Sequence, residues 1–293
     1  MSPFEFFEPA TFREALSHLE PGDTDVRAMG GGTALMLMMK AGVLVPRRLV
    51  SLRRVEPRFS RIEMGEQGEL RIGALSSLSS IEHSPLVERA APVIPKAMKR
   101  LSNVRVRNVA TIGGNLAHAD PHMDMPPILT ALDARVLLIG PAGERIVPID
   151  ELIIGYYETS LGPGELIGEV IIPSQGNRKT AYFKCTTRAV DDWPALGVAA
   201  SLDMQGGVVH GCALVVGAAT DRPTRLKSSE AILEGSAGDE ATLRRMCDAA
   251  VEETDLLSDA QGSAPYKRAL LRVYLGRAVN AAIGLHGTAG RNI

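Results

Sequence analysis

A Gly-Gly pair at residues 113–114 lies among side chains that can hydrogen-bond a ligand. Thr111 and Asn115 flank the pair with a hydroxyl and an amide, which can bond a phosphate or a ribityl chain. Glycine has no side chain, so a ligand can come close to the main chain here. Asp120 and Asp124 follow, and their carboxylates suit sugar or ribityl hydroxyls. The pattern predicts a ligand-holding polar loop, and a tight turn with solvated acids is the alternative.

A second glycine cluster lies at Gly30, Gly31 and Gly32, between a short apolar run and an apolar segment typical of a helix. Glycines that lead into a helix N-terminus favour an anion, because the free N–H groups and the helix dipole both attract it. Thr33 is expected to cap the helix or to donate to a phosphate. The cluster matches neither G-x-G-x-x-G nor the Walker lysine pattern. Two separate glycine loops could therefore grip the two phosphates of a dinucleotide.

Four alternating side chains, His118, Asp120, His122 and Asp124, also permit a different interpretation. Imidazoles and carboxylates are suitable metal ligands, and alternate residues of an extended segment share one face. Such patches also arise often in solvated polar loops. The sequence leaves a metal site here as a minor alternative.

Seven segments together resemble the FAD-binding medium subunit of molybdenum hydroxylases, the family of carbon monoxide dehydrogenase and of the FAD domain of xanthine dehydrogenase. These segments are residues 30–33, 70–75, 105–108, 110–121, 163–167, 181–184 and 222–226. The resemblance implies FAD on this chain, molybdopterin on a large partner subunit and two [2Fe–2S] clusters on a small partner subunit. It also implies a dimer of heterotrimers.

The same resemblance implies a set of FAD-contacting residues and no catalytic residue or metal ligand on this chain. Asp124 would contact the ribityl hydroxyls, and Lys184 would lie near the flavin ring, where a cation stabilises reduced flavin. Trp193 would lie against the isoalloxazine ring. A surface lysine and a core tryptophan are the alternatives for the last two. The full set is Ala28, Met29, Gly30, Gly31, Gly32, Thr33, Ala34, Ala110, Thr111, Gly113, Gly114, Asn115, Ala117, His118, Asp124, Ile167, Lys184 and Trp193.

The resemblance implies an α+β fold in which a two-part FAD-binding domain of the PCMH type precedes a small α+β domain with an antiparallel sheet and helices. The FAD-binding domain is placed at 1–176, with subdomains at about 1–54 and 55–176. The second domain, of the carbon monoxide dehydrogenase flavoprotein type, is placed at 178–286, followed by a tail at 287–293.

Apolar periodicity and turn signals predict the elements that must position these residues. Helices are expected near 11–19, 34–40, 126–132, 228–233, 240–253 and 265–283, with others within 77–83 and 86–101. Strands are expected near 26–29, 46–51, 59–64, 70–73, 135–139, 145–148, 166–172, 182–185, 196–203 and 208–216.

Composition limits the class of protein. The 293 residues carry a net charge of −2, which gives no indication of nucleic-acid binding, and aromatic content is 4%. The three cysteines are scattered, so the chain lacks the spacing of an iron–sulfur or zinc site. No apolar run reaches membrane-spanning length and the first residues are acidic, so a cytoplasmic location is expected.

The leading interpretation is an oxidoreductase subunit that passes electrons from the iron–sulfur clusters of a partner through FAD to an external acceptor. NAD, a quinone, oxygen or another carrier could be that acceptor. One alternative is a stand-alone flavin-dependent oxidase of the same superfamily. Another is a binding module that has lost FAD.

Overall fold

The computed structural model describes residues 2–19, 22–23 and 25–284, and these form two compact units. Unit 1 comprises Met1–Ala90, Ser102–Ala119 and Ala134–Ser174, and unit 2 comprises Ala91–Leu101, Asp120–Asp133 and Gln175–Ile293. The change at Ser174 is close to the predicted boundary at residue 176. Unit 2 also takes two earlier segments that the sequence-based division places in the first domain. The predicted tail at 287–293 lies outside the described residues.

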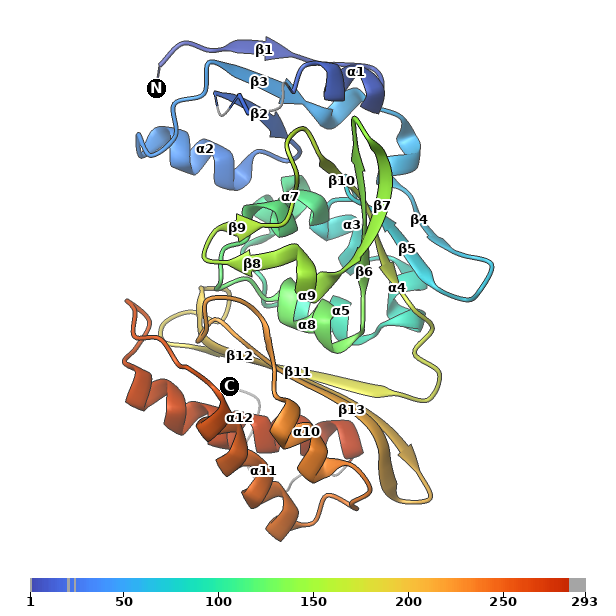
Figure 1. Ribbon diagram of the computed structural model, residues 1–293, viewed down its shortest axis with the longest axis vertical. Helices are drawn as coiled ribbons and strands as arrows, with labels where there is room; N and C mark the ends of the chain where they lie inside the picture. The colour runs from blue at the N-terminus through green and yellow to red at the C-terminus, as the bar shows by residue number, and fades with distance from the viewer. Residues whose placement is uncertain (1, 20–21, 24, 285–293) are drawn as a thin grey trace. The chain divides into compact units, whose positions relative to one another are not determined.

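Unit 1 contains a three-stranded parallel sheet of order β1-β3-β2 (Figure 1). The helix expected near 11–19 is α1, and Thr11 caps it, since its side chain accepts the Glu14 N–H at 3.1 Å. The strand β1 lies outside the predicted set, because three residues are too few to show a period. The elements of this part are β1 (Glu5–Phe7), α1 (Phe12–Ser17), β2 (Val26–Met29), α2 (Thr33–Lys40) and β3 (Arg48–Ser51).

The second sheet of unit 1 is antiparallel, with five strands in the order β4-β5-β10-β6-β7. The strands expected near 59–64 and 70–73 pair as the hairpin β4–β5, and those expected near 135–139 and 145–148 pair as the hairpin β6–β7. The strands are β4 (Ile62–Met64), β5 (Leu70–Gly73), β6 (Arg135–Gly140), β7 (Gly143–Pro148) and β10 (Leu166–Ile172), and a separate pair is β8 (Ile153–Gly155) with β9 (Glu158–Thr159). The helices are η1 (Leu52–Arg54), η2 (Pro57–Ser60), α3 (Leu78–Glu82), α4 (Pro85–Ala90), α6 (Val104–Val109), α7 (Ile112–His118) and α9 (Ile149–Leu152).

One prediction in this region is wrong. The stretch from Thr111 was expected to be a loop, but Ile112–His118 is the helix α7, which packs against β10. Glycine pairs usually mark turns. Here Thr111 supplies an N-cap, and the end of β5 accepts main-chain hydrogen bonds, so tertiary contacts override the local signal.

Unit 2 is built on an antiparallel sheet of order β11-β12-β13-β14, with helices on both faces (Figure 1). Alternate residues of β12 serve the two faces. Val198 and Leu202 join the core beneath α10–α12, whereas Ala199 packs with Ala131 of α8. This explains the almost continuous apolar character of β12. The elements are α5 (Val93–Met98), α8 (Met125–Ala131), β11 (Lys179–Thr186), β12 (Pro194–Gln205), β13 (Val208–Gly217), β14 (Thr224–Arg225), α10 (Lys227–Leu233), α11 (Glu240–Glu253) and α12 (Ala264–Ile283).

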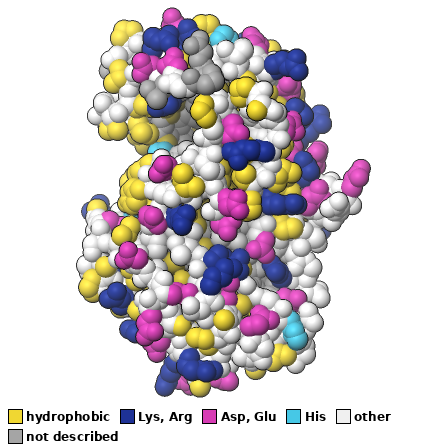
Figure 2. Space-filling model, in the orientation of Figure 1, with side chains coloured by type: hydrophobic (Ala, Val, Ile, Leu, Met, Phe, Trp, Pro, Cys, Tyr) yellow, Lys and Arg dark blue, Asp and Glu magenta, His cyan; other side chains and the backbone are white. Residues whose placement is uncertain are grey.

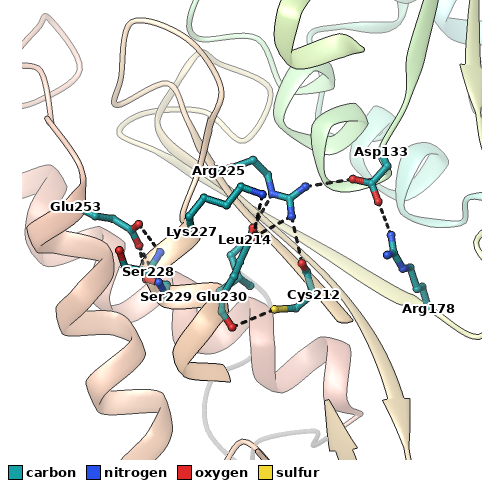
Figure 3. A network of polar contacts seen from close by, with 10 residues as sticks. All are labelled: Asp133, Arg178, Cys212, Leu214, Arg225, Lys227, Ser228, Ser229, Glu230 and Glu253. Atoms are coloured by element: carbon teal, nitrogen blue, oxygen red, sulfur yellow. Dashed lines mark hydrogen bonds and ion pairs between the residues drawn. The ribbon is translucent and has the colours of Figure 1, made fainter. Parts of the chain in front are cut away.

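A half-buried arginine, Arg225, joins the end of α8 to the sheet of unit 2 (Figure 3). Its guanidinium donates to both carboxylate oxygens of Glu230 at 2.6 and 3.0 Å and to the carbonyl of Cys212 at 3.2 Å. It also donates to Asp133 at 3.1 Å, and Arg178, just before β11, binds the same carboxylate. Arg225 lies in residues 222–226, one of the segments that carry the family resemblance.

The surface of the chain has no dominant sign of charge on the face drawn in Figure 2, where acidic and basic side chains are interspersed. This agrees with the net charge of −2. In the described residues, no helix has both the length and the apolar character needed to cross a membrane.

Candidate functional site

The first glycine cluster ends β2 and begins α2. Gly32 has a φ of +72°, a conformation that favours glycine, and it is the N-cap of α2 without a side-chain cap. Thr33 is the first helical residue, so its predicted capping role is wrong. The first N–H groups of a helix have no acceptor within the helix. The N-terminus of α2 therefore presents unpaired donors and the positive end of the helix dipole, which suits a phosphate.

The two glycine stretches lie directly against each other in unit 1. A Cβ atom on Gly31 would be 2.0 Å from the carbonyl oxygen of Val109, and one on Gly30 would be 2.7 Å from Oγ1 of Thr111. No side chain can be accommodated at these distances. Glycine is thus required so that the α2 N-terminus can sit beside the start of α7. The predicted proximity of the two stretches is a feature of the structure.

The two glycines of α7 have different surroundings. Gly113 is buried and donates its N–H to the carbonyl of Ala74 at 2.8 Å, and a Cβ there would be 2.7 Å from the Ala74 Cβ. Gly114 is exposed, its N–H is capped by Thr111 Oγ1 at 3.1 Å, and a Cβ would meet only that hydroxyl, at 3.0 Å. Gly113 therefore serves packing, and the open side of the helix lies at Gly114.

Asn115 adds an observation that points to a missing polar partner. Its Oδ1 atom is buried and has no hydrogen-bond partner within the described chain. A buried, unpaired amide oxygen is costly, so its acceptor is expected to find a donor in the functional state. Asn115 follows Gly114 on α7, so it lies beside the open glycine.

In unit 2, Asp124, Lys184 and Tyr182 form a buried polar group. Lys184 Nζ donates to Asp124 Oδ2 at 2.9 Å and to the Arg100 carbonyl at 2.9 Å, and the Tyr182 hydroxyl donates to Asp124 Oδ1 at 2.7 Å. The Lys184 and Asp124 side chains are only 4% and 5% exposed, so the surface-lysine alternative is wrong. The strand spacing of Tyr182 and Lys184 was the signal for their shared face.

Burial governs the ionisation of this group. Burial raises the pKa of the Asp124 carboxyl, and the Lys184 ammonium and the Tyr182 hydroxyl oppose that rise. Burial, followed by the Asp124 charge, raises the pKa of Tyr182 well above its ordinary value, so the phenol donates as a neutral group. Gly197 makes room for it, because a Cβ there would be 2.5 Å from the phenol oxygen.

Trp193 lies just before β12 and is 54% exposed, so the core-tryptophan alternative is wrong. Its ring stacks on that of His122, with centroids 6.2 Å apart and planes at 27°. His118 instead contacts the ring of Tyr157. Within the described residues, no group of three or more His, Cys, Asp or Glu side chains is placed to hold a metal. The metal alternative therefore has no structural support.

The remaining predicted residues have mainly supporting positions. Ala117 is exposed on α7, whereas Ala110 is buried. Ile167 is buried in β10 beside an irregularity in the strand pairing. Ala28, Met29 and Ala34, which flank the first glycines, are partly buried on β2 and α2.

Comparison with known proteins identifies this arrangement. Residues 2–175 match the family described as FAD binding domain in molybdopterin dehydrogenase, and residues 181–282 match the CO dehydrogenase flavoprotein C-terminal domain. The chain belongs to this flavoprotein family. The implied fold and the FAD cofactor are thereby confirmed.

Relatives cover nearly the whole flavoprotein chain. The carbon monoxide dehydrogenase medium chain of Hydrogenophaga pseudoflava is 30% identical over 95% of this chain and 96% of the relative. The 6-hydroxypseudooxynicotine dehydrogenase complex subunit alpha of Paenarthrobacter nicotinovorans is 31% identical over 96% of this chain and 94% of the relative. A structure of carbon monoxide dehydrogenase from H. pseudoflava, lacking the Mo-pyranopterin moiety of its cofactor, superposes with a TM-score of 0.91 at 31% identity, covering 97% of this chain and 99% of that chain. Quinoline 2-oxidoreductase from Pseudomonas putida 86 superposes with a TM-score of 0.91 at 28% sequence identity. The match covers 98% of this chain and 99% of that chain.

The residues of unit 1 fit the pyrophosphate part of FAD. The α2 N-terminus offers unpaired donors, Gly114 leaves an open surface, and Asn115 keeps an unsatisfied acceptor. The N-terminus of α2 thus provides a positive field for phosphate, and Asn115 Oδ1 can accept a hydrogen bond from a hydroxyl or amide of the ligand.

Proposed function

We propose that this chain is the FAD-binding electron-transfer subunit of a molybdopterin-containing dehydrogenase or hydroxylase. In this role it passes electrons from the [2Fe–2S] clusters of a small partner subunit to an external acceptor. The observation that carries the proposal is the uncapped N-terminus of α2 packed against the start of α7. Bound FAD would supply the redox chemistry, because a flavin exchanges electrons singly or in pairs.

In unit 1, the proposed role of the chain is to bind the FAD pyrophosphate and the adjoining ribityl chain. The main chain of Gly31, Gly32 and Thr33 would donate to phosphate oxygens, supported by the dipole of α2. Gly114 would allow the close approach, and Asn115 Oδ1 would accept from a ligand hydroxyl. Thr111 holds the first turn of α7 through its cap to Gly114.

In unit 2, Asp124, Lys184 and Trp193 are the proposed contacts. Asp124 already accepts from Lys184 and Tyr182, yet each carboxylate oxygen can accept more than one hydrogen bond. It can therefore also receive a ribityl hydroxyl. Lys184 would place a positive charge near the flavin ring, and the exposed indole of Trp193 would cover one ring face and exclude water.

The proposed partners are a large molybdopterin subunit and a small iron–sulfur subunit, assembled as a dimer of heterotrimers in the cytoplasm. The described chain offers no three-residue metal group, and its cysteines, Cys185, Cys212 and Cys247, are free thiols. A partner is therefore the proposed source of the electrons.

The test has two parts. Purified chain should show the visible absorption of non-covalently bound FAD, and it should oxidise no organic substrate by itself. Mixing it with a large molybdopterin subunit and a small iron–sulfur subunit from the same organism should restore turnover with an artificial electron acceptor. Turnover of an organic substrate by the single chain at enzyme-like rates would instead identify the stand-alone oxidase, and a colourless chain that cannot be reconstituted with FAD would refute both.

A further inference from the structure

His122 lies between two carboxylates in unit 2. Its Nδ1 is 3.2 Å from Oδ1 of Asp120, and its Nε2 is 3.0 Å from Oδ2 of Asp259. An ionised carboxylate only accepts hydrogen bonds, so each ring nitrogen must donate to satisfy this geometry. Only the imidazolium form of histidine carries a proton on both nitrogens. Two carboxylates at these distances therefore favour the charged form of His122.

Asp259 is held as an anion by two donors besides His122. Its Oδ1 accepts the main-chain N–H of Gln261 at 2.8 Å, and its Oδ2 also accepts from Nζ of Lys267, a side chain of α12 that is fully buried. Burial raises the pKa of Asp259, but the bonds from Lys267, His122 and Gln261 together bring the pKa below its ordinary value. Asp259 thus stays ionised through the range in which histidine titrates.

Trp193 meets this cluster from the loop that precedes β12. Its half-exposed ring stacks on the His122 ring, and the same loop is joined to the 259–262 segment by a 3.2 Å hydrogen bond from Thr187 to Gln261. A cation beside an indole face is attracted by the ring quadrupole. Trp193 is not held by core packing, because its side chain is half-exposed. The charged His122 ring therefore supports it.

We infer that His122 is a positioning residue for Trp193: held as an imidazolium between Asp120 and Asp259, it fixes the indole, and loss of its proton releases that support. The groups that face the ring are Asp120 from its own segment, Asp259 from the segment before α12, and the uncharged Trp193. Lys267 acts through Asp259. When His122 becomes neutral, one of its nitrogens presents a lone pair to a carboxylate, which is repulsive.

The sign of the pH effect follows from the charges. Burial lowers the pKa of His122, and the hydrogen bonds and charges of Asp120 and Asp259 outweigh it, so the pKa lies above its ordinary value. The stacked arrangement is complete at low pH and is lost as the pH rises through this raised pKa. Its contribution to stability is fully present below about pH 6.5, the pKa of an unfolded histidine.

The chain has a single tryptophan, so its fluorescence reports Trp193 alone. Emission of the FAD-free protein should change in one step between about pH 5 and 9, with a midpoint above about 6.5. His122→Gln should abolish the step. Asp259→Asn should lower the midpoint by about one pH unit, because it removes an opposite charge next to the ring. His210→Gln, at an exposed histidine of β13, is the matched control and should leave the curve unchanged.

A folded wild-type protein without a pH-dependent step would overturn the inference, as would a step that survives in His122→Gln. If His122→Gln does not fold, an unchanged midpoint in folded Asp259→Asn overturns it equally. The consequence for flavin rests on the proposed function and is tested separately in FAD-loaded protein. Flavin emission that follows the tryptophan midpoint supports both proposals, whereas a tryptophan step without a flavin step supports the His122 role and removes Trp193 from the FAD contacts.

Discussion

Replacing Gly114 by valine should weaken FAD binding while leaving the fold intact. The residue is exposed on α7, and an added Cβ would meet only Oγ1 of Thr111, at 3.0 Å. Replacing glycine by valine in a helix gains a few tenths of a kcal/mol from helix propensity, and disturbing the Thr111 cap costs up to about 1 kcal/mol. The free energy of unfolding without FAD should therefore change by less than about 1 kcal/mol.

The loss of affinity can be read from FAD-dependent stabilisation in urea unfolding. At a free FAD concentration of about 100 times the wild-type Kd, binding stabilises the folded chain by about 2.7 kcal/mol. We expect the branched side chain to raise the Kd at least tenfold, since it fills the surface beside the α2 N-terminus. The same FAD concentration would then stabilise Gly114→Val by about 1.4 kcal/mol or less.

The adjacent glycine is the matched control. Gly113→Ala would place a Cβ 2.7 Å from the Ala74 Cβ and 2.9 Å from its carbonyl oxygen, so overpacking should destabilise the FAD-free chain by about 1–3 kcal/mol. The two substitutions should thus separate packing from binding. If folded Gly114→Val is stabilised by FAD as much as the wild type is in urea unfolding, the placement of the cofactor beside α7 is refuted.

Three further outcomes are expected. Lys184→Met should destabilise the chain by about 3–5 kcal/mol in urea unfolding because it strands a buried carboxylate, and adding Asp124→Leu should restore part of that loss; additive losses would contradict the pairing. Arg225→Ala should lower the free energy of unfolding by about 3 kcal/mol. Asp133→Asn should lower it by less than about 1 kcal/mol, because the Asp133 side chain is 44% exposed and asparagine tolerates its φ of +53°. Equal losses for the two variants would argue against the Arg225 network. Burial, followed by nearby glutamates, raises the pKa of Cys212 to about 12, so iodoacetamide at pH 8 should leave it unmodified in native protein, as followed by mass spectrometry; rapid labelling would contradict this.

Much of the secondary structure could be predicted because its signals are local. The capping box at Thr11, the turns of the two hairpins and the long apolar strand beginning near residue 196 all carry their patterns in adjacent residues. The elements that were missed include β1, α6, α7, α9, β14 and the β8–β9 pair. They are short, and in short segments propensity is weak against tertiary contacts.

The sequence by itself indicated the family and the FAD cofactor, because the short segments that carry the family resemblance are runs of neighbouring residues. Only the tertiary structure decided that Gly113 serves packing while Gly114 is open, since that depends on the carbonyl of Ala74 at the end of β5. It also decided that Lys184 pairs with Asp124, 60 residues away, and that His122 lies between Asp120 and Asp259. The physical reason is that burial and ionisation depend on which distant groups the fold brings within hydrogen-bond range, and the local pattern of a chain does not contain that information.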